Sequence, residues 1–132
     1  MTATIRSGTM HRQWVLAERP VAAITARTFA MREEPVPEPG EGEALVRVVW
    51  LGIDPTQRTW LNEGATYLNP VAEGEVMRGS GVGQVIASKN ARLTIGDWVY
   101  GRTGWQEYVL TDDERGCLDS IRSLRGSIRR RC

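Results

Sequence analysis

The side chains best suited to chemistry lie close together in the chain, between positions 54 and 67. In the run LGIDPTQR, Asp54 and Arg58 stand four residues apart and Pro55 follows the carboxylate. Such a carboxylate and guanidinium can form a catalytic pair, or the carboxylate can cap a helix with the guanidinium as its ion partner. Tyr67 follows in the run TYLNP, and a phenol can donate a hydrogen bond to a carbonyl oxygen. A tyrosine packed on the rim of a sheet is the alternative for Tyr67.

A strand, a tight turn and a short helix must position this group. Residues 44–51 alternate in side-chain direction and are rich in Val, Leu and Trp, which is typical of a half-buried strand. Gly52 permits a change of direction, Asp54 can cap the next helix, and Pro55 suits the first helical position. The pattern predicts about two helical turns over residues 56–61, ended by the run Asn-Glu-Gly.

The rest of the chain indicates short strands separated by turns. Trp14 and Leu16 should share one face of the first strand, Phe29 and Met31 should point inward, and the five indoles should fill the central layer. The sequence therefore predicts a mainly β fold, a strongly bent sheet or partial barrel with one short helix. The further strands are expected over residues 11–17, 28–34, 75–78, 81–88, 98–101 and 106–110.

Neither a metal site nor a disulfide framework is expected. His11 is the only histidine, and the only cysteines, Cys117 and Cys132, both lie within the last sixteen residues. Metal ligands need a fixed spacing, and a disulfide framework needs more cysteines within the fold. We interpret the two cysteines as free thiols.

The run GSGVGQ, residues 79–84, invites interpretation as a dinucleotide-binding loop. That fingerprint needs a third glycine at the right offset and a helix behind it, so that free N–H groups meet the pyrophosphate. The residues after the last glycine, Gln-Val-Ile-Ala, favour a strand. We therefore expect these glycines to mark a bulge or a corner of the sheet.

The net charge of +1 hides an asymmetry along the chain. Residues 1–114 carry 11 basic and 15 acidic side chains, whereas residues 115–132 carry six Arg and one Asp. The mildly acidic main part gives no reason to expect a nucleic-acid partner. No apolar run has the ~18–20 residues of a membrane span, and no signal peptide is evident, so a cytoplasmic protein is expected.

Five runs follow one another along residues 11–110: RQWVLAERPVA, EEPVPEPGEGEALVRV, LGIDPTQR, GEVMRGSGVGQVIAS and GDWVYGRTGWQEYVL. In this order they resemble the zinc-independent medium-chain reductases. This is the prostaglandin reductase and leukotriene 12-hydroxydehydrogenase group of NADPH-dependent 2-alkenal and enone reductases. The resemblance implies the GroES-like fold of the substrate side of these enzymes, and NADP(H) as the cofactor of the full-length proteins.

The resemblance also implies site residues. Tyr67 matches the loop where related reductases place a tyrosine, and is the candidate catalytic residue. Asp54, Pro55 and Arg58 form the family-like turn and would shape the wall of the substrate cleft. Arg102 and Thr103 match the final loop at the substrate site, and Trp105 matches the family's Gly-Trp segment as pocket floor or core.

We expect three regions along the chain. Residues 1–10 are a flexible N-terminus, residues 11–110 a GroES-like N-terminal oxidoreductase domain, and residues 111–132 a basic tail. The family continues there into a linker and a nucleotide-binding Rossmann domain, which the tail does not resemble. We interpret the tail as the product of truncation or a frame shift; a basic segment that binds RNA or an acidic membrane is the alternative.

Two functions from different classes remain open. The first is the substrate-side domain of an NADP(H)-dependent enone or alkenal oxidoreductase, inactive alone and unable to bind the cofactor tightly. Its partner would be a small molecule, with no nucleic acid or membrane, and a homodimer is conceivable for the full-length form. The second is a non-catalytic GroES-like binding or interaction module. A glycine-rich phosphate loop between a strand and a helix would discriminate them, and the sequence contains none.

Overall fold

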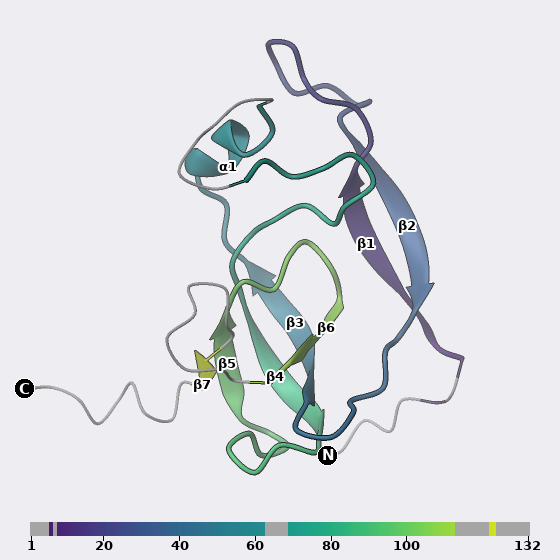
Figure 1. The fold of residues 1–132 in the computed structure, drawn as a ribbon, viewed down its shortest axis with the longest axis vertical. Coiled ribbons are helices and arrows are strands. Elements are labelled where there is room, and N and C mark those ends of the chain that lie inside the picture. The colour runs from purple at the N-terminus through teal and green to yellow at the C-terminus, as the bar shows by residue number, and fades with distance from the viewer. Residues whose placement is uncertain (1–5, 7, 63–68, 113–121, 124–132) are drawn as a thin grey trace, which may run out of the picture.

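Antiparallel strands make up almost all of the regular secondary structure of the described residues (Figure 1). The computed structural model describes residue 6 and residues 8–62, 69–112 and 122–123. This confirms the prediction of a mainly β, GroES-like bent sheet with one short helix, and the sheets stay open rather than closing into a barrel. The described elements are β1 (Met10–Leu16), β2 (Phe29–Pro35), β3 (Ala44–Leu51), α1 (Thr56–Thr59), β4 (Gly81–Ser88), β5 (Trp98–Gly101), β6 (Tyr108–Thr111) and β7 (Arg122–Ser123).

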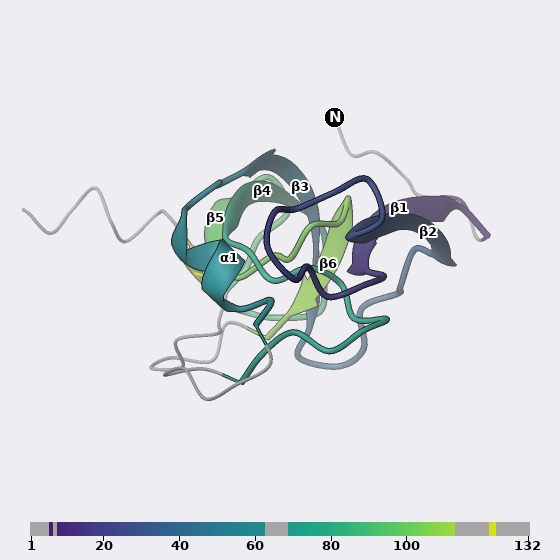
Figure 2. The same cartoon turned by 90° about the horizontal axis from the view of Figure 1, so that it is seen from above.

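The strands form two sheets. β1 and β2 make a hairpin in continuous register, from Met10 opposite Pro35 to Leu16 opposite Phe29. The second sheet has five strands in the order β6-β3-β4-β5-β7, all antiparallel. Seen from above, the hairpin lies beside β6 and away from β5 (Figure 2). Two isolated bridges, Gln13 with Gln106 and Val15 with Val76, connect the hairpin to the rest of the chain.

The glycine run that could suggest a dinucleotide-binding loop lies in and before β4, as predicted. The β3–β4 pairing shifts register between Val48 and Trp50, where Gly83 and Val82 are the partners. A Cβ added at Gly83 would lie 2.5 Å from the Arg47 carbonyl oxygen. Glycine is therefore needed at position 83 because the bulged neighbouring strand approaches its backbone closely.

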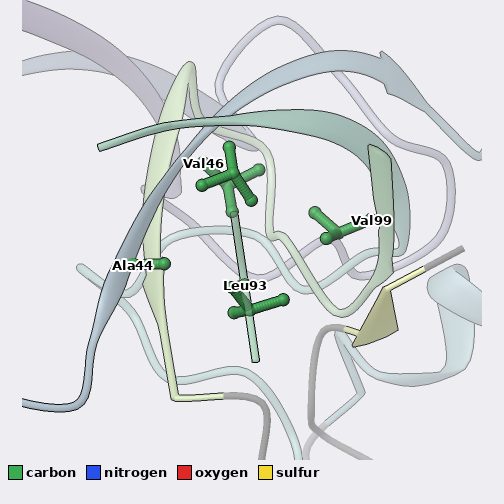
Figure 3. Close-up of a cluster of buried hydrophobic side chains, with 5 residues drawn as sticks. Ala44, Val46, Leu93 and Val99 are labelled. Atoms are coloured by element: carbon green, nitrogen blue, oxygen red, sulfur yellow. The ribbon is translucent and has the colours of Figure 1, made fainter. Parts of the chain in front are cut away.

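Two apolar clusters form the core. The first lies within the five-stranded sheet and consists of Ala44, Val46, Val85, Leu93 and Val99, four of which Figure 3 labels. The second lies between the hairpin and α1, and consists of Leu16, Leu61, Val71 and Met77 with Phe29, Trp60 and Trp105 packed against it. The second cluster supports the turn that carries the candidate site.

The prediction that the indoles fill the central layer is wrong for three of the five tryptophans. Trp14 is 41% exposed, Trp50 68% and Trp98 43%. The inner face of β1 instead carries His11, Gln13 and Val15, so Trp14 points outward while Leu16, at the strand end, is buried.

The prediction that Met31 points inward is also wrong, because its side chain is 46% exposed. β2 pairs only with β1 among the described strands, so much of its surface meets solvent.

Candidate functional site

The Asp54 side chain organises the turn that follows β3. Its Oδ1 accepts hydrogen bonds from the Thr56 backbone N–H, at 2.8 Å, and from the Thr56 hydroxyl. The bond from the Thr56 hydroxyl, and after it the bond from the Thr56 N–H, lower the pKa of Asp54 below its ordinary value, so the exposed carboxylate stays ionised. The prediction that Asp54 caps the helix is wrong, because Pro55 is the N-cap of α1 and no side chain caps it, while Asp54 bonds Thr56 within the turn. The helix ends at Thr59 rather than at residue 61.

Gln57 locks the same turn from inside. Its side chain is 6% exposed, although it belongs to a short surface helix. Gln57 Oε1 accepts the Asp54 backbone N–H at 3.0 Å, and Gln57 Nε2 donates to the Gly52 carbonyl at 3.2 Å. Both ends of the turn are therefore tied to one buried amide.

Arg58 does not bond Asp54, which corrects the expected ion pair. Its Nη1 donates to Asn62 Oδ1 at 2.7 Å, and its Nη2 donates to the Ala22 carbonyl at 2.9 Å. Arg58 therefore fastens α1 to the loop between β1 and β2, which lies at the same end of the molecule (Figure 1). Asp54 is already satisfied by Thr56, which leaves Arg58 to bridge these two segments.

A cleft of about 300 Å³ opens between this turn and the second core cluster. Its walls are almost entirely apolar. Four of the residues predicted for the site meet here, namely Asp54, Pro55, Arg58 and Trp105. The other lining residues are Ile24, Phe29, Ile53, Gln57, Leu61 and Met77.

Trp105 reaches the cleft from the far end of the chain. Its backbone N–H donates to the Met77 carbonyl, and its carbonyl accepts the Trp14 N–H, each at 2.9 Å. The indole packs on Phe29 with ring centres 5.1 Å apart and planes at 44°. Three chain segments therefore hold the Trp105 ring.

A second, more polar cavity of about 350 Å³ lies on the other side of the turn. It shares Ile53, Asp54 and Gln57 with the apolar cleft, and Trp60 and Ser80 complete its inner wall together with Gly52 and Thr56. Arg78 lies over the Trp60 ring at 5.5 Å from its centre, a cation–π contact. The turn thus separates an apolar space from a polar one.

Two predicted site residues that the structure describes, Arg102 and Thr103, do not line the cleft. Thr103 is 1% exposed, and its hydroxyl donates to the Gly104 carbonyl at 3.1 Å. Arg102 is half-buried next to it, outside the lining of the cleft. Tyr67 lies outside the described residues. The roles of these three side chains stay predictions.

Sequence reasoning missed Gln57, Ile24 and Ile53 as parts of the site. Gln57 stands within the LGIDPTQR run, and a glutamine two residues after the proline was a usable signal because it can bond back to the turn. Ile24 and Ile53 lie in loops, and no local pattern assigns them to a cleft.

The chain matches the model of the family described as the N-terminal domain of oxidoreductase over residues 12–117. The chain belongs to this family. It is 39% identical over 104 residues to the NADPH-dependent curcumin reductase of Escherichia coli strain K12, across 79% of this chain and 30% of that one. It is 26% identical over 104 residues to prostaglandin reductase 1 of Bos taurus, again across 79% and 30%.

Among solved structures, CurA from Vibrio vulnificus superposes with a TM-score of 0.77 at 46% identity, across 79% of this chain and 31% of that one. The same relative in complex with NADPH superposes with a TM-score of 0.75. These matches confirm the predicted kinship with the prostaglandin reductase group of medium-chain reductases. The chain spans about 30% of the length of these relatives.

No helix in the described part of the chain has the length and apolar character needed to cross a membrane. Within the same residues, His, Cys, Asp and Glu side chains do not gather in groups of three or more that could hold a metal ion.

Proposed function

We propose that this chain forms the substrate side of the active site of an NADP(H)-dependent reductase acting on the C=C bond of enones or alkenals. The observation that supports this most is the apolar cleft, where Trp105 meets Asp54, Pro55 and Arg58 although it lies far from them in the sequence. The curcumin and prostaglandin reductases among its relatives support the substrate class.

The apolar lining would hold the carbon skeleton of the substrate. Ile24, Ile53, Phe29, Leu61 and Met77 offer hydrocarbon surface, and a cavity of about 300 Å³ suits a small molecule. Burying the apolar surface of such a substrate contributes roughly 25 cal/mol of favourable binding free energy for each Å² removed from water. The rigid turn keeps this wall in place, because Gln57 and Arg58 bond it on both sides.

NADPH supplies a hydride when it is bound to enzymes of this kind. The described residues do not fit its phosphates, because the glycine run at positions 79–84 leads into strand β4 and no helix N-terminus follows it. Reaction steps that involve the cofactor are therefore not assigned to residues of this chain. Its phosphates would be held by the part of the relatives that this chain does not span.

We further propose that residues 11–110 act as the domain and residues 111–132 as a basic tail. The family match over residues 12–117 supports the first boundary, as do the ends of β1 and β6. In the described part of the tail, β7 pairs with the edge of β5.

A fusion protein tests the proposed function. Residues 1–112 would replace the matching part of the Vibrio vulnificus relative, and NADPH oxidation would be followed with an aryl enone. We expect reduction of the enone, and a loss of kcat/KM in the Ile24→Ala fusion.

Ile95→Ala is the matched control, because Ile95 is 49% exposed and Ile24 is 50% exposed, but only Ile24 lines the cleft. A folded fusion that binds NADPH and leaves the enone unchanged would contradict the proposal and favour a non-catalytic binding module.

A further inference from the structure

We propose that strand β7 closes an edge of the five-stranded sheet that would otherwise pair with a second copy of the chain. The surface is the outer edge of β5, and its occupant in the native chain is the segment Arg122–Ser123. The tail would thereby keep the chain monomeric at this edge. This inference does not depend on the proposed enzymatic activity.

The pairing with β7 turns β5 from an edge strand into an inner strand. The two strands run antiparallel, with Ser123 opposite Val99 and Arg122 opposite Tyr100. In the sheet order β6-β3-β4-β5-β7, the other neighbour of β5 among the described strands is β4 (Figure 1). Without residues 122–123, the outer backbone groups of β5 would lie at an open edge.

The covering strand comes from outside the family domain. The family match covers residues 12–117, and β7 begins at Arg122. Within the matched residues that the structure describes, β5 has β4 as its single partner strand. The strand that closes this edge is therefore supplied by residues beyond the family domain.

The sequence of β5 gives its edge little protection. An open edge strand presents unpaired N–H and C=O groups to other chains, and proteins commonly guard such edges with charged residues or proline. β5 has the sequence Trp-Val-Tyr-Gly, which contains neither. Val99 is fully buried in the first core cluster, whereas Trp98 is 43% exposed and Tyr100 49%. Such an uncharged strand with exposed aromatic side chains favours pairing with another strand.

The hairpin provides a contrast within the same molecule. Among the described strands, β2 also has a single partner, which is β1. Its sequence contains Arg32, Glu33 and Glu34, and it ends at Pro35. Charged residues and a proline discourage the addition of a further strand. The edge of β2 is thus guarded by its own sequence, whereas the edge of β5 depends on β7.

A second copy of the chain is the partner that fits an open β5. Two β5 edges can pair antiparallel about a twofold axis, and neither strand carries a charge that would repel the other. The tail competes with such a partner because only ten residues separate β6 from β7. A short tether gives an effective concentration on the order of millimolar, so a second copy at micromolar concentration is outcompeted.

Sedimentation velocity tests the inference on three chains: the native chain, residues 1–123, which keep β7, and residues 1–112, which lack it. A reducing agent prevents disulfides through Cys117 or Cys132. Over about 1–100 μM, we expect the native chain and residues 1–123 to stay monomeric. The weight-average mass of residues 1–112 should rise toward twice the monomer mass as the concentration increases.

A double variant of the 132-residue chain tests the same edge without truncation. Arg122→Pro with Ser123→Pro removes the backbone N–H groups of β7 and should cause the same self-association. Ser127→Pro with Arg130→Pro is the matched control, since it changes the same residue types beyond β7. The control should stay monomeric.

Several outcomes would overturn the inference. One is that residues 1–112 and the β7 double variant stay folded and monomeric over the whole range, and another is that the native chain self-associates. Association of residues 1–112 that leaves all β5 amides in free hydrogen exchange would place the contact elsewhere. Hydrogen exchange of the native chain needs no variant: the β5 amide that faces β7 should be protected, and free exchange there would mean that the edge is open.

Discussion

The imidazole of His11 packs edge-on against the ring of Tyr108, with ring centres 5.8 Å apart and planes at 74°. His11 belongs to β1 and Tyr108 to β6, so this contact joins the hairpin to the five-stranded sheet. The His11 side chain is 2% exposed, and its Nδ1 has no hydrogen-bond partner. A titratable group therefore lies at the junction of the two sheets.

The first prediction is that stability falls as the pH drops below about 6.5, the ordinary pKa of histidine. Burial lowers the pKa of His11, and the carboxylates of Glu107 and Glu34 oppose this only in part. The unfolded chain then binds the proton more tightly than the folded protein, so protonation favours unfolding between the ordinary pKa and the folded one. Urea unfolding from about pH 8 to pH 5 measures this change.

His11→Phe should flatten that pH dependence, because the ring stays and the titrating group goes. Glu107 and Asp54 also have lowered pKa values, caused first by hydrogen bonds from Arg12 and Thr56. Their contribution is present at neutral pH and is lost only as the pH falls below their ordinary values of 4.5 and 3.8. An unchanged slope in the variant above pH 4.5 would show that His11 is not the cause.

The second prediction concerns the bulge between β3 and β4. Gly83→Ala should lower the free energy of unfolding by about 1–3 kcal/mol, because the new Cβ would overlap backbone atoms that cannot move aside. It would lie 2.5 Å from both the Arg47 carbonyl oxygen and Val46 Cγ1. Gly52→Ala is the control, with its nearest atom, the Ser80 carbonyl oxygen, at 3.4 Å. Equal unfolding midpoints for the two variants would contradict the prediction.

The third prediction concerns the second core cluster. Leu16 is fully buried beside Leu61, Val71 and Met77. Leu16→Ala should cost about 2–5 kcal/mol of unfolding free energy, since it removes transfer energy and leaves a cavity. Ile95→Ala, at a residue 49% exposed, should change stability by only about 0.5 kcal/mol. Denaturant unfolding of the two variants tests the difference, and similar losses would mean that this cluster is not a core.

The fourth prediction is that the 132-residue chain shows no saturable NADPH binding at micromolar concentrations. Among the described residues the glycine run leads into strand β4 rather than into a helix, and the four-residue helix α1 does not follow it. In related folds the N-terminus of a helix after such a run anchors the pyrophosphate. The fusion with the rest of the Vibrio vulnificus relative should regain binding. Isothermal titration calorimetry measures both proteins, and tight binding by the chain alone would refute the prediction.

The fifth prediction is that Tyr67→Phe in that fusion lowers kcat by about tenfold or more, if the phenol donates to the developing oxyanion. Tyr100→Phe is the control, because Tyr100 is 49% exposed on β5 and lies outside the cleft. Turnover that responds equally to both substitutions would remove Tyr67 from the mechanism.

Much of the strand layout was predictable from local pattern. Residues 44–51, 81–88 and 98–101 are strands with the predicted bounds, because alternating side chains and flanking turn residues act over short distances. The faces of Trp14 and Met31 were predicted wrongly. Their exposure depends on which segment packs against the hairpin, and this is a long-range property that periodicity does not contain.

The candidate site was predictable only in part. Asp54, Pro55 and Arg58 lie in one run, so their proximity follows from the chain itself. Trp105 was predicted as a site residue only from the family resemblance, since no local sequence pattern relates it to a turn about fifty residues earlier. The expected Asp54–Arg58 ion pair is absent because the carboxylate accepts from Thr56. Arg58 instead donates to the nearby Asn62 side chain and to the Ala22 carbonyl, which is distant in sequence.

The cleft has walls from four separate stretches of chain, represented by Phe29, Gln57, Met77 and Trp105. None of these stretches can close the cleft by itself, so the chain must first form contacts between residues far apart in sequence. Such contacts make folding slow, because the entropy of closing long loops is lost before the contacts compensate for it. A cleft ligand would therefore bind only folded molecules, in which the two sheets are in contact. By mass action it would shift the equilibrium between folded and unfolded chains toward the folded state. For this chain, ligand occupancy becomes a measure of completed folding.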